Sequence, residues 1–389
     1  MPLLRQTLTW LVLPWAALTW PSQDPGRAPS PPSPPAAVAP RDEAWFAPEQ
    51  AAVCAAAAER GLAWLAERQL TSGCWTGHVG HKMNHDYILL GEAMSKDAQA
   101  QRGHGHLGVT ALCGMAFLAG GHLPDRGTYA EVVRRIHDYV VGCCQENGFL
   151  TDAGTRMYSH AFATLFLAEI HGMAATESAK LALERAVNLI VDCQNAAGGW
   201  RYNVFDRETD LSVTVCQLQA LRAARNIGIR VPAETIDRAL AYVLKSRVER
   251  GRERGLFYYK IYGRGAYDKP SEYAINAAGL TALASAGVHD DNLNDPVLAF
   301  LSREYGTIAD YNRTHFYFWY GNYYAAQAFY QYGGSRCRTF FARLAKDLLE
   351  AQASDGRWRN DVGPGDEMAT SIACILLQMP KQYLPIFQR

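Results

Sequence analysis

Two kinds of helical pattern alternate along the chain from about residue 50 onward. The first kind is amphipathic, with one charged and one apolar face, as in RLAKDLLEAQ at 343–352. The second kind is apolar, small or aromatic around most of its circumference, as in SEYAINAAGLTALASAG at 271–287. A helix with one polar face lies at a surface, whereas a helix that is apolar all round is buried. The pattern therefore predicts buried helices inside a layer of amphipathic ones.

The alternation is an internal repeat with a period of about 50 residues, lengthened in its first unit by a His-rich insertion near 76–106. The first helices of the six units are expected to end at Gln69, Gln145, Gln194, Arg247, Arg303 and Gln352. The second helices are expected at 107–121, 158–173, 210–228, 271–287, 315–334 and 366–379. Six buried helices inside six amphipathic helices describe a closed double ring, and we predict an all-α fold, an (α/α)6 toroid.

Three of the turns between first and second helices share one spacing, in which a Gln is followed six residues later by a Trp across a Gly-containing turn. The three pairs are Gln69 with Trp75, Gln194 with Trp200 and Gln352 with Trp358. A Gln amide can satisfy backbone groups left without partners at a helix end, while the Trp ring covers the pair. We therefore assign these residues a structural role, which is to seal neighbouring helix ends.

The N-terminal part of the chain differs from the rest in composition. Residues 1–20 combine Arg5 with an apolar run that is short for a membrane span, which is typical of a signal peptide or an N-terminal anchor. Residues 21–44 are rich in Pro, Ser and Ala and predict an extended linker, so the toroid is expected over 45–389. We therefore expect an exported protein, periplasmic or otherwise outside the cytoplasm, that the N-terminal segment could hold on a membrane.

Net charge and cysteine positions say little about which molecules the protein binds. The formal net charge is zero, which gives no reason to expect a nucleic-acid partner. Of nine cysteines, Cys113, Cys216 and Cys374 fall within apolar helical patterns and are expected to be buried thiols. The basic loop over 247–269 could attract a diphosphate or an anionic membrane surface, although charged loops are usually only solvated.

The Gln-to-Trp turns, the six helix pairs and closing segments such as QASDGRWRND at 352–361 resemble the prenyltransferase and squalene-cyclase (squalene oxidase) repeat superfamily. The similarity is greatest to its bacterial members that are known only by the repeat. This resemblance covers about residues 50–389. It implies a toroid with an isoprenoid or another apolar small molecule in its central cavity, as in terpene cyclases and protein prenyltransferase β-subunits. Because a fold does not determine a function, the site has to be argued separately.

The cyclases of this superfamily protonate a double bond with an Asp-x-Asp-Asp motif at the start of an inner helix. Glu208 and Asp210 match its first and middle positions, whereas Leu211 replaces the last acid. The resemblance therefore implies Asp210 as a general acid supported by Glu208, because such an acid must stay protonated in an apolar cavity. The alternative is that Asp210 caps the helix that follows it, since Asp is among the best N-cap residues.

No cofactor is expected. The Asp, Cys and His that hold zinc in prenyltransferase β-subunits have no counterpart here, and the diphosphate-binding Asp-Asp-x-x-Asp motif is also missing. His78, His81 and His85 in the insertion could bind a transition metal, but their spacing fits no closed ligand pattern. A polar loop over the mouth of the ring is the alternative interpretation.

If the inner helices are parallel, their N-termini share one rim, where positive helix ends favour carboxylates and anionic ligands. The fifth inner helix adds aromatic rings that could stabilise a cation, stack on a sugar or fill the core. Candidate ligand-binding residues at the rim and on the inner helices are His160, Thr214, Glu272, His315, Tyr317, Trp319, Tyr320 and Asp366.

Three functions follow as hypotheses. The first is a terpene-cyclase-like or prenyltransferase-like toroid that binds an isoprenoid, with acid-initiated chemistry at Asp210. The second is an exported, non-catalytic binding or scaffold protein of the same fold. The third is a carbohydrate-active toroid with paired acids drawn from Asp210, Glu272 and Asp366, which requires two carboxylates within about 10 Å of each other at an open cleft.

Overall fold

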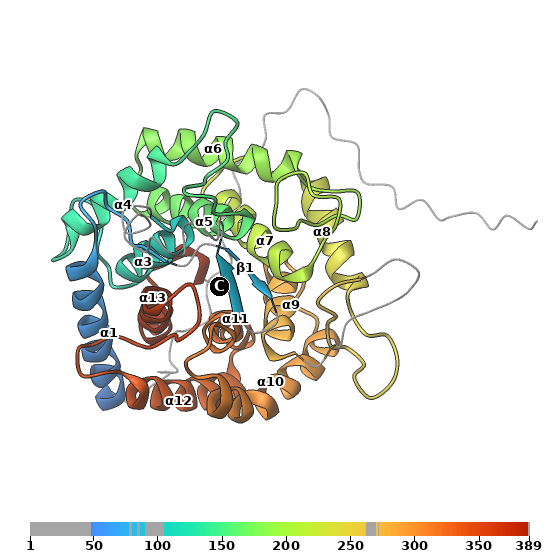
Figure 1. The fold of residues 1–389 in the computed structure, drawn as a ribbon. Coiled ribbons are helices and arrows are strands. Elements are labelled where there is room, and N and C mark those ends of the chain that lie inside the picture. Colours follow the sequence, from blue (N-terminus) through green and yellow to red (C-terminus); the bar gives the residue numbers. More distant parts are fainter. Residues whose placement is uncertain are drawn as a thin grey trace, which may run out of the picture. The chain divides into compact units, whose positions relative to one another are not determined.

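The computed structural model describes residues 48–77, 80–83, 86–89, 105–261, 270 and 272–387. The predicted signal segment and linker, 1–20 and 21–44, lie outside these residues. The described residues form a double ring of helices, as Figure 1 shows along the ring axis. The predicted all-α toroid is therefore confirmed. No helix in the described part of the chain is long and apolar enough to cross a membrane.

The twelve α-helices of the described residues divide into an outer and an inner ring. The outer helices are α1 (Pro48–Arg68), α4 (Ala130–Gly142), α6 (Glu177–Asp192), α8 (Ala233–Lys245), α10 (Asp291–Asn312) and α12 (Gly334–Ala351). The inner helices are α3 (Leu107–Ala119), α5 (Met157–Met173), α7 (Leu211–Asn226), α9 (Tyr273–Ser285), α11 (Phe316–Tyr332) and α13 (Asp366–Gln378). Each inner helix packs on the next in this order, and α13 packs on α3, which closes the ring.

Burial explains which helices lie inside. All thirteen residues of α3 are buried, as are the first twelve of α9. In the outer helix α8, by contrast, only one stripe is buried, formed by Thr235, Ala239, Tyr242 and Val243. The residue types along each helix therefore set its layer, as the amphipathic pattern predicts.

The fifth unit departs from the predicted boundaries. Helix α10 does not end at Arg303 but continues to Asn312, and α11 begins only four residues later, at Phe316. No residue of this unit supplies the Gly-Trp turn that ends other outer helices, so the helix continues where the turn would otherwise stop it.

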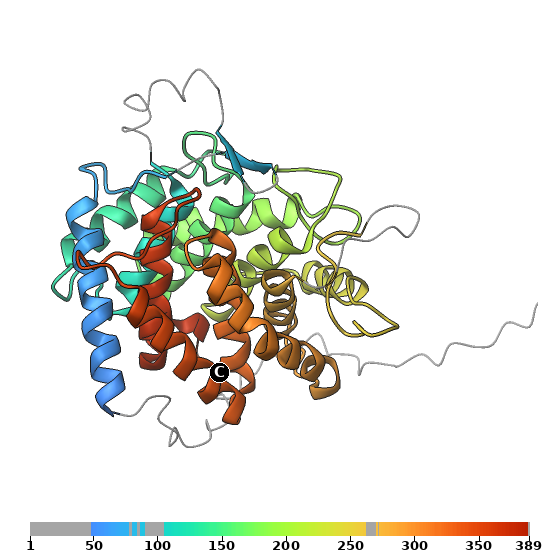
Figure 2. The ribbon, with the colours of Figure 1, turned by 60° about the horizontal axis from the view of Figure 1, so that its bottom comes forward.

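The insertion of the first unit contains a short antiparallel hairpin, β1 (Gly80–Met83) and β2 (Asp86–Leu89), with His81 opposite Ile88. The hairpin precedes α3 in the chain, and the N-terminus of α3 lies at the rim where the inner helices begin. Figure 2 shows the hairpin at that end of the ring, and Figure 1 shows it in front of the central region.

The Gln and Trp side chains of the three matching turns make the same bonds in each unit. In the third unit the Gln194 amide donates to Gly198 O at 2.7 Å and to Thr235 O of the next outer helix at 2.9 Å. The Trp200 indole donates to Ile190 O at 2.8 Å. Its backbone N–H donates to the Thr214 hydroxyl on the inner helix. Each turn therefore joins its own outer helix, the next outer helix and an inner helix.

Gly198 must be a glycine in this arrangement. Its φ is +93°, and an added Cβ would lie 2.3 Å from Arg238 O. The equivalent Gly73 and Gly356 meet the carbonyls of Arg135 and Arg60 in the same way. In the fourth unit Arg247 replaces the Gln, and its guanidinium donates to Gly255 O and Leu293 O. Two donors placed to reach both carbonyls are what the turn requires, and an amide or a guanidinium can supply them.

The C-terminal segment packs on the opposite end of the ring from the rim. The short helices η3 (Met379–Lys381) and η4 (Pro385–Phe387) follow α13, and η4 lies against α5 and α7. The Ile386 N–H donates to Glu169 Oε2 at 3.1 Å, and the Glu169 side chain is buried. Burial raises the pKa of Glu169 to about 8.

We expect Glu169→Gln to stabilise the protein at alkaline pH. A carboxyl whose pKa is raised in the folded state stabilises the fold below its ordinary pKa, and loses that contribution as pH rises through about 8. Gln stays neutral and can still accept from Ile386, so the melting temperature should rise by a few degrees at pH 9 and change little at pH 5. Thermal unfolding of Glu169→Gln and of the exposed control Glu253→Gln at both pH values tests this. An equal shift in the two variants, or a shift that does not depend on pH, would contradict it.

Candidate functional site

Asp210 lies at the rim, at the N-cap of α7, and its side chain is fully buried. Its Oδ1 accepts from the Val213 N–H at 2.9 Å and from the Ser212 hydroxyl at 2.6 Å. The Tyr158 hydroxyl lies 2.5 Å from Ser212 Oγ. Since Ser212 gives its own proton to Asp210, Tyr158 must donate to Ser212. A chain of hydrogen bonds thus leads from the half-buried Tyr158 to the buried carboxylate.

The other carboxylate oxygen of Asp210 belongs to an ion-pair network. The Arg201 guanidinium lies 3.3 Å from Asp210 Oδ2 and 3.2 Å from Glu208 Oε2. The Lys260 ammonium lies 2.8 Å from Glu208 Oε2. The two predicted acids are therefore matched by two cations, and the network joins the loop before α7 to the loop before α9.

The surroundings shift the pKa values of the two acids in this network in opposite directions. The Lys260 ammonium, by hydrogen bond and charge, lowers the pKa of Glu208, so this carboxylate is ionised. Burial raises the pKa of Asp210, while the Ser212 hydroxyl, the Val213 N–H and the Arg201 charge oppose that rise. Every Asp210 contact comes from a donor, which is the arrangement of a capping carboxylate rather than of an acid with a proton to deliver.

Side chains of α11 cross the interior of the ring. The Tyr320 hydroxyl donates to Ser212 O of α7 at 3.0 Å, and the Tyr324 hydroxyl lies 3.0 Å from Cys216 Sγ of the same helix. The Tyr323 ring packs against Phe162 of α5, with ring centroids 5.9 Å apart. Because α9 separates α7 from α11 in the ring and α5 lies opposite α11, these contacts fill the central space at this level.

Two other predicted residues, His160 and Thr214, accept hydrogen bonds from the turns that link outer and inner helices. His160 is buried in α5, and its Nδ1 accepts from the Leu150 N–H at 3.1 Å. Thr214 accepts from Trp200 in the same way, so His160 occupies in the second unit the position that Thr holds in the third. Burial lowers the pKa of His160 to about 4, and its imidazole is neutral.

The remaining predicted residues lie at helix starts or in the core. Glu272 and His315 are the N-cap residues of α9 and α11, and His315 accepts from the Tyr317 N–H. Asp366 begins α13, where it accepts from the Asn360 N–H and pairs with Arg357 at 3.3 Å. Trp319 is buried, and its indole donates to Arg359 O. The rim thus gathers residues from the starts of the inner helices.

The metal candidates stay a prediction. His78 and His85 lie outside the described residues, and His81 is in β1. Within the part of the chain that the structure describes, no three His, Cys, Asp or Glu side chains are grouped as a metal site requires.

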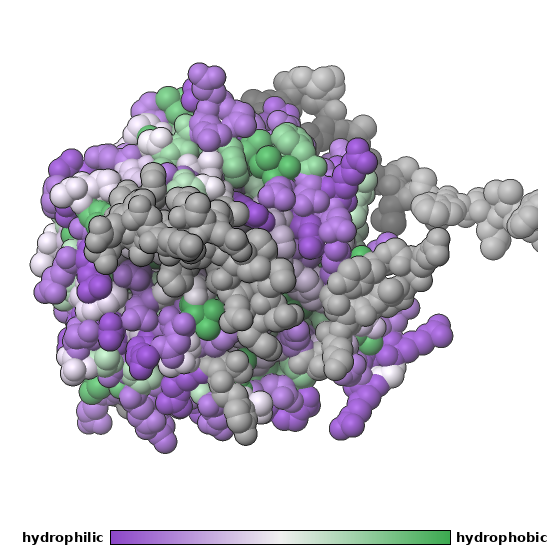
Figure 3. All heavy atoms as spheres, viewed as in Figure 1, coloured by the Kyte–Doolittle hydropathy of each residue, from purple (hydrophilic) through white to green (hydrophobic). Residues whose placement is uncertain are grey.

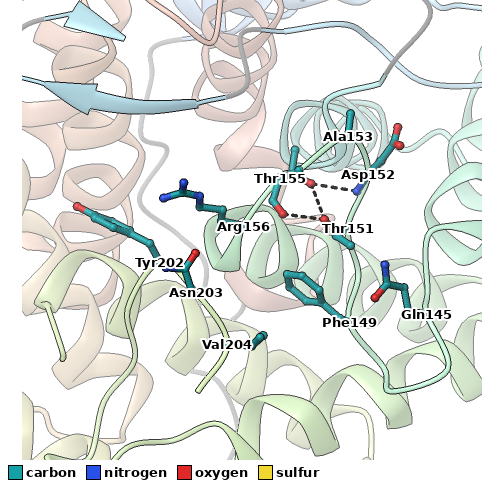
Figure 4. A pocket seen from close by; sticks show the side chains of 11 residues that line it. Gln145, Phe149, Thr151, Asp152, Ala153, Thr155, Arg156, Tyr202, Asn203 and Val204 are labelled. Carbon is teal, nitrogen blue, oxygen red and sulfur yellow. Dashed lines mark hydrogen bonds between the residues drawn. The ribbon is translucent and has the colours of Figure 1, made fainter. Parts of the chain in front are cut away.

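A pocket of about 560 Å³ opens at the rim between the second and third units. Figure 4 shows it between the turn before α5 and the segment after Trp200. Planar polar groups and two aromatic rings line it. The lining residues are Gln145, Phe149, Thr151, Asp152, Ala153, Gly154, Thr155, Arg156, Tyr202, Asn203 and Val204.

Internal contacts hold the walls of this pocket in place. Asp152 Oδ2 accepts from the Tyr139 hydroxyl of α4 at 2.6 Å, and the Thr155 hydroxyl accepts from the Asp152 N–H. On the other wall, the Tyr202 hydroxyl bonds to that of Tyr259, and the Arg201 guanidinium stacks on the Tyr202 ring at 4.8 Å. The described residues on this face of the molecule are mainly hydrophilic, with apolar side chains scattered among them (Figure 3).

None of the pocket residues is among the candidates predicted from the sequence. The pocket forms between turns of two units, and each turn by itself looks like a solvated loop. One signal was available in the repeat, because Arg156 stands at the start of the second inner helix, where the third, fourth and sixth units have Asp210, Glu272 and Asp366.

No protein-family model matches the sequence, and a search of curated proteins finds no match. The type II terpene cyclase MstE from Scytonema, in complex with geranylgeranyl dihydroxybenzoate, has a similar structure. It superposes with a TM-score of 0.54 at 12% identity, covering 88% of this chain and 100% of that chain. The predicted resemblance to a cyclase is thus matched by a shared fold and by no sequence match.

Carbohydrate-active proteins are similar to the same degree. An α-1,6-mannanase of family GH76 from Salegentibacter, in complex with α-1,6-mannotriose, has a TM-score of 0.55 at 8% identity over 84% of this chain and 98% of that chain. An unsaturated glucuronyl hydrolase specific for heparin has a TM-score of 0.56 at 11% identity over 85% of this chain and 97% of that chain. At such identities the comparisons show the α/α toroid fold alone.

Proposed function

We propose that the protein binds a hydroxyl-rich ligand of the oligosaccharide class in the rim pocket. The observation that carries the proposal is the composition of this 560 Å³ pocket. Amides of Gln145 and Asn203 supply both donors and acceptors there, beside the hydroxyls of Thr151 and Tyr202, which also bond to Thr155 and Tyr259. A site of this kind matches the many hydroxyl groups of a sugar, which are themselves donors and acceptors.

The aromatic side chains support the same ligand class. Phe149 and Tyr202 lie on opposite sides of the pocket, where their faces can stack on the apolar face of a sugar ring (Figure 4). The proposal is also supported by the glycan-active toroids among the similar structures, one of them with α-1,6-mannotriose bound.

The interior of the ring gives less support to an apolar ligand. Tyr320, Tyr323 and Tyr324 reach from α11 to α7 and α5 and narrow the interior that a polyprene chain would enter. Asp210 is surrounded by hydrogen-bond donors and Arg201. We therefore place the ligand at the rim and give Asp210 a structural role.

A glycan array screened with wild-type protein should identify a bound oligosaccharide, and Asn203→Ala and Tyr202→Ala should each weaken its binding about tenfold. Asn203 is exposed, so its removal leaves the fold intact, and Tyr202→Ala removes the stacking surface. Tyr383, an exposed tyrosine outside the pocket, provides the matched control Tyr383→Ala. Titration calorimetry measures the affinities. Equal binding by all four proteins would exclude this pocket, and no binding across the array would exclude the ligand class.

Acid-initiated isoprenoid chemistry is the second candidate. It is favoured by one observation, the fully buried carboxyl of Asp210 at the start of an inner helix, whose pKa burial raises. The terpene cyclase MstE, with its geranylgeranyl substrate, supports the same candidate through its similar fold. Mass spectrometry of lipids that co-purify with the protein would identify a bound polyprene.

A further inference from the structure

Arg156 breaks the charge pattern of the repeat. In the third, fourth and sixth units, an inner-helix side chain accepts a hydrogen bond from a backbone N–H of the preceding turn. The residue four positions before that acceptor is an acid in each of these units, namely Asp210, Glu272 and Asp366. An acid there complements the positive end of the helix dipole, whereas a cation opposes it. The second unit has Arg156 at this position, before the acceptor His160. Placing a guanidinium at a helix N-terminus costs stability unless something compensates for it.

No protein group that the structure describes provides this compensation. The acids at the equivalent positions are paired, Asp210 with Arg201 and Asp366 with Arg357. Arg156, in contrast, has neither a carboxylate partner nor a side-chain hydrogen bond among the described residues, and no side chain caps α5. The carboxylate that shares its pocket, Asp152, is bonded instead to the Tyr139 hydroxyl.

The guanidinium is placed where a ligand would meet it. Arg156 is half-buried and lines the 560 Å³ pocket, between the turn that carries Thr155 and the ring of Tyr202 (Figure 4). Asn203 and Thr155 line the same pocket and supply neutral hydrogen-bonding groups around the charge. A guanidinium with free N–H groups is the side chain best shaped to take a carboxylate or a sulfate through two bonds.

We infer that the pocket recognises an oxyanion carried by its ligand, a uronate carboxylate or a sulfate ester of an acidic oligosaccharide, through Arg156. This inference rests on the proposed function for the ligand class, but its electrostatic part does not. An anionic group would pair with the guanidinium and also compensate for the cation at the start of α5. A neutral sugar would leave the guanidinium without an anionic partner and would leave its positive charge at the start of α5 uncompensated.

The first arm of the test uses tetragalacturonate and the neutral tetrasaccharide made by reducing its carboxyls, together with sulfated and neutral glycans on an array. Wild type should bind acidic glycans in preference to neutral ones. Arg156→Gln should lose about tenfold to a hundredfold in affinity for the acidic ligands only. Arg156→Lys, which keeps the charge, should retain part of the preference. The exposed Arg230 provides the control Arg230→Gln, which should behave as wild type.

The second arm needs no glycan. Sodium sulfate, compared with sodium chloride at equal ionic strength, should raise the melting temperature of wild type and of Arg230→Gln more than that of Arg156→Gln. If glycans bind but acidic and neutral ones bind equally in wild type and Arg156→Gln, the oxyanion inference is wrong and the proposed function stands. If no glycan binds but sulfate stabilises wild type through Arg156, the oxyanion site stands and the ligand class is wrong. If no glycan binds and sulfate stabilises wild type and Arg156→Gln equally, both the ligand class and the oxyanion site are wrong.

Discussion

Replacing Trp200 by Ala is expected to lower the free energy of unfolding by about 3 to 5 kcal/mol, the usual cost of removing a large buried aromatic side chain. Trp200 is 1% exposed, and its indole donates to Ile190 O at 2.8 Å. The substitution leaves a cavity between two helix layers and deprives that carbonyl of a donor. Its effect should exceed that of a typical core substitution, because the indole ring covers a turn whose remaining bonds join two outer helices and one inner helix, and its removal exposes those bonds to water.

Urea unfolding followed by circular dichroism provides the measurement, with the exposed Leu181 as control site. Leu181→Ala should change stability by about 0.5 kcal/mol or less, as surface substitutions do. A loss below about 1 kcal/mol for Trp200→Ala would mean that the turn does not hold the layers together.

The fold could be predicted because each of its determinants is local and repeated. Amphipathic and apolar helices alternate, and the Gln194-to-Trp200 spacing recurs in the first and sixth units. Arg247 shows the limit of the motif, since a guanidinium makes the two turn bonds and no search for Gln would find it. The predicted boundary of α10 is wrong for another reason: the repeat places a helix end at Arg303, but the turn that ends other outer helices is missing there and the helix continues to Asn312.

The site was harder to predict because its contacts join different units. The pairing of Arg201 with Glu208 and Asp210 depends on the path of a loop, and Lys260 reaches the same network from the next unit. A motif match at Asp210 cannot reveal those partners. The crossing of the ring by Tyr320 and Tyr324 likewise depends on which face of α11 points inward, which a helix that is aromatic on all sides does not disclose.

Asp210→Ala is expected to destabilise the protein by about 2 to 4 kcal/mol, the combined cost of losing a helix N-cap and of leaving the buried donors of Ser212 and Val213 without their acceptor. The substitution removes the N-cap of α7 and the acceptor of Ser212, and it leaves Arg201 with Glu208 alone. Asp366→Ala is the matched control, because Asp366 also begins an inner helix but keeps 25% of its side chain exposed. It should cost about 1 kcal/mol, because Asp366 is not the N-cap of its helix and loses only the bond from the Asn360 N–H and a partly exposed ion pair with Arg357.

Asp210→Asn separates the structural role from a catalytic one. Asn caps helices nearly as well as Asp, so a structural Asp210 predicts that Asn costs clearly less than Ala, with the remaining loss due to the charge that balances Arg201. A cyclase acid predicts a different result, in which wild type converts squalene or another polyprene and Asp210→Asn abolishes that turnover at unchanged stability. The two measurements are independent, because unfolding reports on the bonds from Ser212, Val213 and Arg201, whereas turnover reports on proton delivery. Urea unfolding of both variants, together with the turnover assay, therefore decides which role the carboxyl has.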